Sequence, residues 1–265
     1  MTDIASRVGV QSMSAFSSAS QLDHVAASAS QQAMRRNAQV TAEMPSRLLN
    51  VDTSTATTTI DFLLLPNFDL QDLSALSDVL ALANQLSGRP IVSSRLMSPS
   101  GEPVITSVGY SVVPKYDVLQ IQRSANVFLL AGSGQRRLDP RIARWLRRQL
   151  QHGAHIGVIG AAAPVLASTG MLNGGRCAAH WADIEAWTEL YSEVEFHDRV
   201  YSIDGKIVSC SGGLGSIDLA IACVRQLCGS GMANDIADRF NYDRVRDEHD
   251  SQSPNPGLAK GYHSP

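Results

Sequence analysis

The segment His155–Trp181, with the sequence HIGVIGAAAPVLASTGMLNGGRCAAHW, decides the expected fold. Its first five residues, HIGVI, form a short apolar run that is typical of a buried strand. Gly160 follows, and the alanine-rich AAAPVLAS stretch after it favours a helix. A strand that turns sharply into a helix often carries a nucleophile in α/β proteins, because the turn exposes one side chain beside free helix N–H groups. Here the turn holds Gly160 and Ala161, and neither can attack a substrate.

On both sides of this segment, apolar strand-like runs alternate with helical patterns. The expected strands cover residues 60–65, 91–97, 126–134, 199–203 and 206–209, and the expected helices cover 72–86, 141–150, 182–191, 216–227 and 232–240. A hairpin is expected within 98–110. This alternation predicts an α/β fold with a largely parallel sheet and right-handed crossovers. Ligands of such sheets bind at the carboxyl ends of the strands, which points to the loops 66–72, 131–135 and 160–163.

Composition limits the class of protein. The chain has 265 residues, of which 44% are hydrophobic and 18% charged, and its net charge is −3, so its surface as a whole is not a nucleic-acid footprint. The cysteines lie in or beside apolar segments without CxxC spacing, so we expect reduced thiols and no metal or cofactor. No apolar run approaches the roughly 20 residues that span a bilayer, and the N-terminus lacks the order of a secretion signal. We therefore expect a cytoplasmic protein.

Three regions are expected along the chain. Residues 1–57 contain ten Ser, ten Ala and one aromatic residue, Phe16, so they are predicted to form a disordered extension, with a short helix allowed at 21–36. Residues 58–250 are predicted to form the folded domain. Residues 251–265 are predicted to form a flexible tail.

Four blocks resemble a known family. They are LLLPNFDLQDLSALSDVL (63–80), VIGAAAPVLASTGMLNGGRCAAHW (158–181), SCSGGLGSIDLAIACV (209–224) and RFNYDRVRDEHDSQ (239–252). They are similar to the sensor half of AraC-type transcriptional regulators that carry a DJ-1/PfpI-like (class I glutamine amidotransferase-like) domain, in particular regulators of quaternary-amine, carnitine and arginine catabolism. The resemblance implies a flavodoxin-like three-layer sandwich that forms a homodimer and binds a small metabolite.

The resemblance also assigns roles at the turn after HIGVI. In DJ-1/PfpI enzymes that position holds a Cys, which an acid from the first loop and a His assist. On this chain the resemblance places the Cys at Gly160, the acid at Asp72 and the His at His180. The nucleophile is therefore missing, which favours a non-catalytic, ligand-sensing domain. The alternative is a hydrolase or lyase in which Asp72 and His180 position a water molecule.

A second departure from the family concerns DNA binding. Regulators of this family continue past the RDEHD block into a helix-turn-helix module, as the resemblance implies. Here the block is followed by SPNPGLAKGYHSP (253–265), which has no room for a two-helix reader. We therefore expect no specific DNA binding by this chain itself. A full-length relative is a candidate partner.

The expected ligand is a small cationic or zwitterionic metabolite. Asp72 would supply a negative charge, and Phe68 and Trp181 would supply ring faces for a cation. His180 would donate a hydrogen bond. Each residue also has a structural interpretation: Asp72 as a helix N-cap, His180 as a satisfied histidine and Trp181 as part of the core.

The ligand's own carboxylate would need hydrogen-bond donors. The backbone N–H groups at Ser133–Gly134 and Gly160–Ala161 follow two of the expected strands and are suited to bind an anion. For Ser133 and Gly134, a plain turn is the alternative. Cys177 lies off the elbow and is expected to be an inert, buried thiol.

One basic cluster remains. Arginines stand at positions 136, 137, 141, 144, 147 and 148, several of them at helical spacing. They form either a surface for phosphate or nucleic acid, or the solvated face of a helix whose other face, with Leu138, Ile142, Trp145 and Leu146, packs in the core.

Overall fold

The structure is a computed structural model that describes residues 47–51 and 56–252. The described residues belong to one compact unit, 46–265. Most of the predicted extension, including the predicted 21–36 helix, and residues 253–265 of the predicted tail lie outside the described residues.

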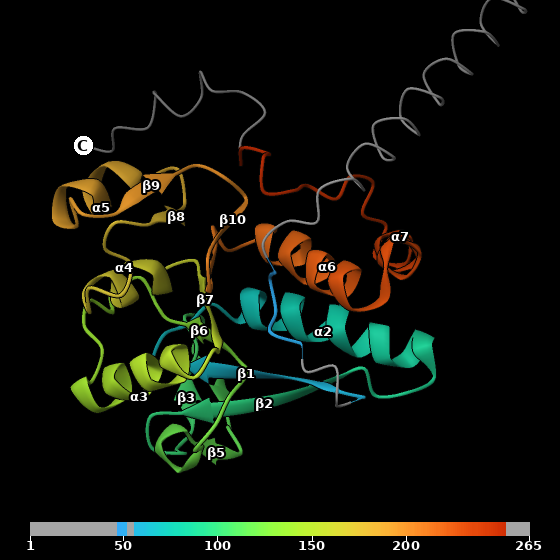
Figure 1. The fold of residues 1–265 in the computed structure, drawn as a ribbon, viewed down its shortest axis with the longest axis horizontal. Coiled ribbons are helices and arrows are strands. Elements are labelled where there is room, and N and C mark those ends of the chain that lie inside the picture. Colours follow the sequence, from blue (N-terminus) through green and yellow to red (C-terminus); the bar gives the residue numbers. More distant parts are fainter. Residues whose placement is uncertain (1–46, 52–55, 253–265) are drawn as a thin grey trace, which may run out of the picture. The chain divides into compact units, whose positions relative to one another are not determined.

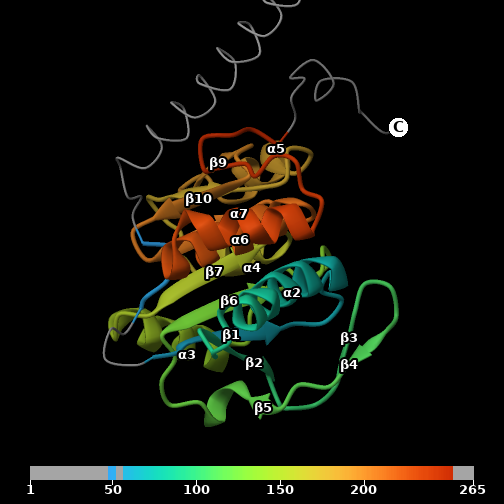
Figure 2. The same cartoon turned by 90° about the vertical axis from the view of Figure 1, so that its right-hand side faces the viewer.

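A seven-stranded sheet forms the centre (Figures 1 and 2). Its spatial order is β10-β11-β7-β6-β1-β2-β5. Only β10 is antiparallel to its neighbour, so the prediction of a largely parallel sheet is confirmed. The strands are β1 (Thr58–Leu64), β2 (Val92–Ser98), β5 (Tyr116–Asp117), β6 (Asn126–Leu130), β7 (His155–Ile159), β10 (Tyr201–Asp204) and β11 (Ile207–Cys210).

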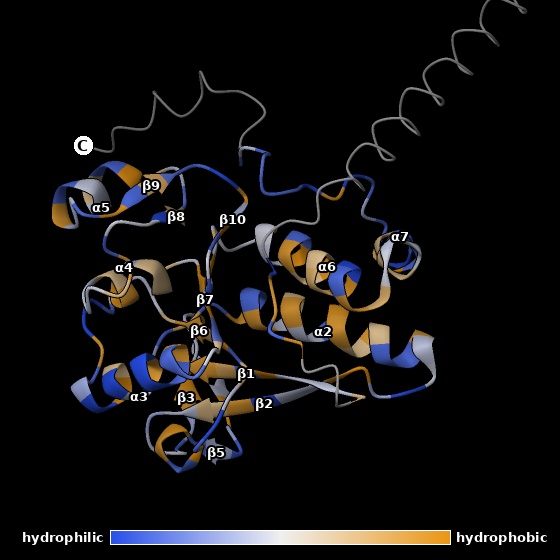
Figure 3. Cartoon of the chain, in the orientation of Figure 1, coloured by the Kyte–Doolittle hydropathy of each residue, from blue (hydrophilic) through white to orange (hydrophobic). Residues whose placement is uncertain are grey.

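Helices cover both faces of the sheet and complete the predicted three-layer sandwich. One face carries α2 (Leu70–Ser87), α6 (Gly215–Cys228) and α7 (Ser230–Arg239), and the other carries α3 (Pro140–Gln151), α4 (Ala162–Ala167) and α5 (Ile184–Leu190). Each face has its own apolar core. Along β1, Phe62 and Leu64 pack under α2, whereas Leu63 packs toward α3 and α4, because successive side chains of a strand point to opposite faces. Hydrophobic colour therefore concentrates on the central strands and the inner faces of the helices, while α3 is mostly hydrophilic (Figure 3).

The start of α2 corrects one structural interpretation of the sequence. Asp69, not Asp72, is the N-cap, and its side chain accepts a hydrogen bond from the N–H of Gln71. The helix begins at Leu70, two residues earlier than predicted, so Asp72 lies inside its first turn. Asp72 therefore does not cap the helix, and its carboxyl group is available for hydrogen bonds to other parts of the chain.

Several short elements were missed or placed differently by sequence reasoning. Strand β5, the 3-10 helix η1 (Val118–Gln120) and the two-stranded parallel sheet of β8 (Arg176–Ala178) and β9 (Glu195–His197) were not predicted. The expected hairpin forms slightly later than 98–110, from β3 (Val104–Ile105) and β4 (Ser111–Val112). Strands of two or three residues are too short to display a period of two in the sequence.

Both ends of the described chain pack on the domain. Leu48 and Leu49 are buried, and the backbone of Leu49 exchanges two hydrogen bonds with the side chain of Gln226 on α6. After α7, residues 241–252 form what we call the C-terminal strap (Figure 1, red). The buried carboxylate of Asp218 on α6 anchors it by accepting hydrogen bonds from Tyr242 and Arg246. In the described part of the chain, no helix combines the length and apolarity needed to cross a bilayer.

Candidate functional site

Four loops meet at the carboxyl edge of the parallel strands. The Gly132 N–H, after β6, donates to the carbonyl of Pro66, after β1, and the Gly160 N–H, after β7, donates to the carbonyl of Cys210 at the end of β11. These loops include the three that the sequence indicated. The fourth, residues 211–214 after β11, was missed.

Gly160 forms the predicted sharp turn between β7 and α4. Its φ of 55° lies in the left-handed region, which glycine tolerates without steric cost. A Cβ atom built on Gly160 would lie 3.2 Å from Oδ2 of Asp72 and 3.7 Å from the Cα atom of Gly212. A side chain at this position would therefore point at the Asp72 carboxyl group, which is the relation that the resemblance implied for the nucleophile and the acid.

Asp72 is a buried acid, with 5% of its surface exposed. Its Oδ1 atom accepts hydrogen bonds from the N–H of Gly213 at 2.7 Å and from the hydroxyl of Ser216 at 2.8 Å. Burial raises the pKa of Asp72 from 3.8 to about 6, although both hydrogen bonds oppose the shift. Within the described residues both hydrogen bonds fall on Oδ1, so Oδ2 is the oxygen left to face Gly160.

Gly212 lies close to the Oδ2 atom of Asp72 and to Gly160. It has a φ of 82°, and a Cβ atom there would lie 3.0 Å from the Cα atom of Gly160 and 3.2 Å from Oδ2 of Asp72. Sequence reasoning assigned no role to Gly212, Gly213 or Ser216. The signal was present, because SCSGGLGS places a glycine pair between a buried strand and a helix, as in the other loops at this edge.

Two predicted ligand contacts are used elsewhere. Phe68 is fully buried in the core beneath α2, so no face of its ring is open to solvent. The chain turns just before it, at Asn67, whose φ of 58° lies in the left-handed region. The N–H of Gly160 is already donated to Cys210, which leaves Ala161 as the donor of that predicted pair. Ser133 and Gly134 are exposed, and their N–H groups make no hydrogen bond within the described residues.

His180 and Trp181 occupy a turn that follows β8. His180 is exposed, Trp181 is half-buried, and their ring centroids lie 5.3 Å apart. Gln252, at the end of the strap, holds this turn from both sides: its Oε1 accepts from the N–H of Trp181, and its Nε2 donates to the carbonyl of Ala179. Within the described residues, no hydrogen bond or ring contact joins this turn to Asp72.

Three of the four cysteines are buried. Burial raises the pKa of Cys177, Cys210 and Cys223 to about 12, and the expectation that the Cys177 thiol is buried is confirmed. Cys228 is half-buried at the end of α6, and burial raises its pKa as well. Among the described residues, no group of three or more His, Cys, Asp or Glu side chains could hold a metal ion.

The fold agrees with comparisons to known proteins. The family model of the DJ-1/PfpI family matches residues 58–226. The chain belongs to the DJ-1/PfpI family. The HTH-type transcriptional regulator CdhR of Pseudomonas aeruginosa is 30% identical to it over 192 residues, which cover 72% of this chain and 57% of that protein. A crystal structure of an AraC family transcriptional regulator from Pseudomonas putida has the same fold, with a TM-score of 0.61 and 22% identity, over 69% of this chain and 99% of that chain.

Two further facts set the limits of this family relation. The chain spans little more than half the length of curated helix-turn-helix regulators that it matches. It is also similar to an enzyme, the isonitrile hydratase of Pseudomonas putida, with 26% identity over 191 residues that cover 69% of this chain and 78% of that enzyme. The relatives thus include an enzyme as well as transcriptional regulators. An assignment of function to this chain therefore depends on the residues at its elbow.

Proposed function

We propose that residues 58–250 form a non-catalytic sensor domain that binds a small cationic or zwitterionic metabolite beside Asp72. The proposal rests on one observation: Gly160, which has no side chain, lies beside the buried carboxyl group of Asp72. The elbow presents no side chain that can attack a substrate, and the Oδ2 atom of the buried acid faces the space that a nucleophile would occupy. A binding role uses this carboxylate directly, whereas a covalent catalytic role lacks its central atom.

A cationic ligand suits this arrangement. A quaternary ammonium group has no N–H to donate, so a carboxylate and a ring face are the groups that attract it, at about 0.5–2 kcal/mol per ring contact. Oδ2 of Asp72 is the proposed carboxylate contact and the half-buried Trp181 is the proposed ring. The N–H groups of Ser133 and Gly134, which make no hydrogen bond within the described residues, are the proposed donors to a ligand carboxylate, together with that of Ala161.

The relatives also support a proposal about the cellular process in which the sensor takes part. Because the chain is similar to helix-turn-helix transcriptional regulators, we place the sensor in transcriptional regulation in the cytoplasm. It would act as a homodimer or pair with a full-length relative. Sedimentation should then give twice the chain mass of 28.4 kDa for the purified protein.

Calorimetry over a pH series tests the ligand site. Betaine, carnitine, choline and arginine are titrated into the full chain, with a neutral metabolite as control. We expect a Kd of about 1 µM at best. Affinity for the cation should rise as pH increases from 5 to 7.5, because the pKa of Asp72 is raised to about 6 and only the ionised acid attracts the ligand.

Two variants sharpen this experiment. Asp72→Asn should weaken cation binding and remove its pH dependence. Asp78→Asn removes the same charge from an exposed position of α2 and should change neither. A neutral or anionic metabolite that binds best, or an unchanged pH profile in Asp72→Asn, would show that the ligand lies elsewhere.

A hydrolase or lyase is the second candidate, and two observations favour it. The chain is similar to an isonitrile hydratase, and a carboxyl pKa of about 6 suits acid–base chemistry near neutral pH. The absence of a side chain at Gly160 argues against it, because the elbow then offers no nucleophile for a covalent intermediate. Multiple turnovers of an isonitrile, lost in both Asp72→Asn and His180→Ala, would establish the enzyme and overturn the sensor.

A further inference from the structure

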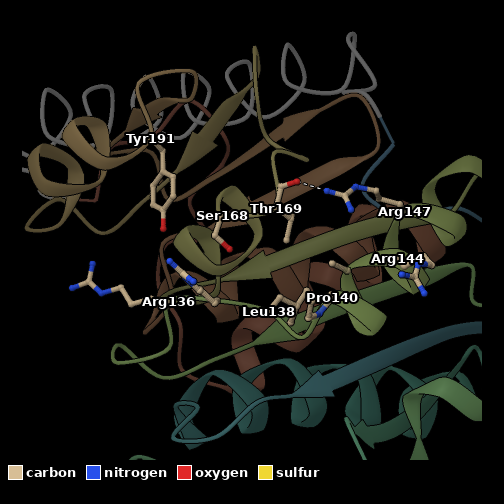
Figure 4. A pocket seen from close by; sticks show the side chains of 10 residues that line it. Arg136, Leu138, Pro140, Arg144, Arg147, Ser168, Thr169 and Tyr191 are labelled. Carbon is tan, nitrogen blue, oxygen red and sulfur yellow. Dashed lines mark hydrogen bonds between the residues drawn. The ribbon is translucent and has the colours of Figure 1, made fainter.

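A second concave site lies on the α3 side of the sheet. A cavity of about 700 Å³ opens between α3, the end of α4 and Tyr191, which follows α5 (Figure 4). Four arginines line it: Arg136 and Arg137 from the segment before α3, and Arg144 and Arg147 from α3 itself. None of the residues proposed for the Asp72 site contributes to it.

Among the described residues, no carboxylate pairs with the positive charges around this cavity. Of the four guanidinium groups, that of Arg147 donates instead to the backbone carbonyl of Thr169. The nearby acid, Asp139, is committed to Arg141, which lies outside the cavity lining. Four like charges around one hollow repel one another, and a bound anion removes that repulsion.

The rest of the lining suits a small ligand. Leu138, Pro140 and Ala143 supply apolar surface. The hydroxyls of Ser168 and Thr169 donate to backbone carbonyls at the end of α4. The phenol of Tyr191, by contrast, points into the space between the helices and makes no hydrogen bond in the described part of the chain, so it is a free donor beside the arginines (Figure 4).

We propose that this cavity binds a small molecule that carries phosphate groups. Guanidinium groups bind phosphate through two parallel N–H···O bonds, and several of them around one hollow match an anion of more than one charge. The volume lies within the roughly 300–1,000 Å³ of small-molecule sites. A concave surface that is closed on one side by Tyr191 fits such a ligand better than the convex backbone of a duplex. This site is independent of the sensor function proposed above.

Under this proposal, the two interpretations of the basic cluster apply to different arginines. The solvated-face interpretation accounts for Arg141 and Arg148, which lie on α3 outside the cavity. The other four arginines form the anion site. Helical spacing in the sequence could not separate the two groups of arginines, because the cavity also depends on Tyr191, which tertiary packing brings close to α3.

Calorimetric titration of the full chain with pyrophosphate at physiological salt tests the proposal, with citrate and a short duplex DNA as comparison ligands. We expect saturable binding of pyrophosphate by the wild type, tighter than that of citrate. Arg144→Gln and Arg137→Gln, both at exposed positions, should each weaken pyrophosphate binding about tenfold through loss of a charge-assisted contact. Tyr191→Phe should weaken it several-fold with no change in charge.

Arg148→Gln is the matched control. It removes one positive charge from the same helix outside the cavity lining and should weaken pyrophosphate binding clearly less than Arg144→Gln does, because it takes away no direct contact with the anion. If Arg148→Gln weakened pyrophosphate binding as much as Arg144→Gln, the effect would come from the overall positive charge of α3, and the proposed site would be wrong. The proposal also fails if pyrophosphate does not bind saturably, if citrate binds more tightly, or if duplex DNA binds and loses affinity in the same variants. Asp72→Asn should leave pyrophosphate binding unchanged.

Discussion

The ionisation of Asp72 ties the stability of the domain to pH. Burial raises its pKa to about 6, so the folded state holds the proton more tightly than the unfolded chain does. The contribution of this group to the free energy of unfolding is therefore full below about pH 4 and is lost as pH rises through 6. Asp72→Asn has no such titration.

Urea unfolding of both proteins between pH 4 and 7.5 measures this contribution. The difference in unfolding free energy between wild type and Asp72→Asn should change across this range by about 2–3 kcal/mol at most, in the direction that disfavours the wild type at high pH. Asp78→Asn should follow the wild type. Parallel curves for wild type and Asp72→Asn would mean that this carboxyl group titrates normally.

Restoring a thiol at the elbow is the second prediction at this scale. Gly160→Cys should fold at a cost of about 1–2 kcal/mol, because a φ of 55° is unfavourable for a side chain. Its thiol should react with iodoacetamide faster than the buried native cysteines and show a pKa below the usual 8.5 or so, because the thiolate would form at the start of α4 while Asp72 still holds its proton and donates a hydrogen bond to it. The new negative charge should in turn raise the pKa of Asp72 further above its value of about 6.

Gly174→Cys is the control, with a φ of 75° and no atom within 4 Å of the added Cβ. It carries similar backbone strain without an acid, so its thiol should have an ordinary pKa. Similar pKa values in the two variants would remove the evidence for a chemically tuned elbow.

The N-cap of α2 provides a test of one element. Asp69→Ala removes the acceptor for the N–H of Gln71 and should lower the free energy of unfolding by about 1 kcal/mol. It should also lower the pKa of Asp72, because the charge of Asp69 contributes to the upward shift. NMR titration of the Asp72 carboxyl group, with Asp78→Ala as control, measures the second effect. An unchanged pKa would mean that burial alone sets it.

The elements also show what the sequence could and could not predict. Central strands such as β1 and β7 were predictable because both faces are covered and the runs are continuously apolar. The Gly160 turn was predictable from its place between a strand and a helix. The burial of Phe68 was not predictable, because it depends on how the loop after β1 packs into the core. The partner of Asp72 was not predictable, because Gly213 lies 141 residues away in the chain. Long-range contacts of this kind leave no local pattern.

For the whole molecule, we predict no sequence-specific binding to duplex DNA by the purified chain. The consecutive helices α6 and α7 are the pair that most resembles a reader, but both pack into the core, with Ala233, Ile236 and Ala237 of α7 buried. The net charge of −3 adds no general attraction. Fluorescence anisotropy at physiological salt measures this; salt-resistant binding to one sequence that unrelated DNA fails to displace would contradict it.

Two hydrogen bonds of the Gln252 side chain connect the turn around His180 to the C-terminal strap. A single side-chain amide holds the backbone on both sides of that turn, and the same amide sits at the far end of a strap that Asp218 fastens to α6. The glutamine side chain can rotate and either bond can break alone, but a displacement of the Trp181 backbone would cost the strap the bond that Gln252 accepts there. We therefore expect a ligand that moves this turn to loosen the end of the C-terminal strap.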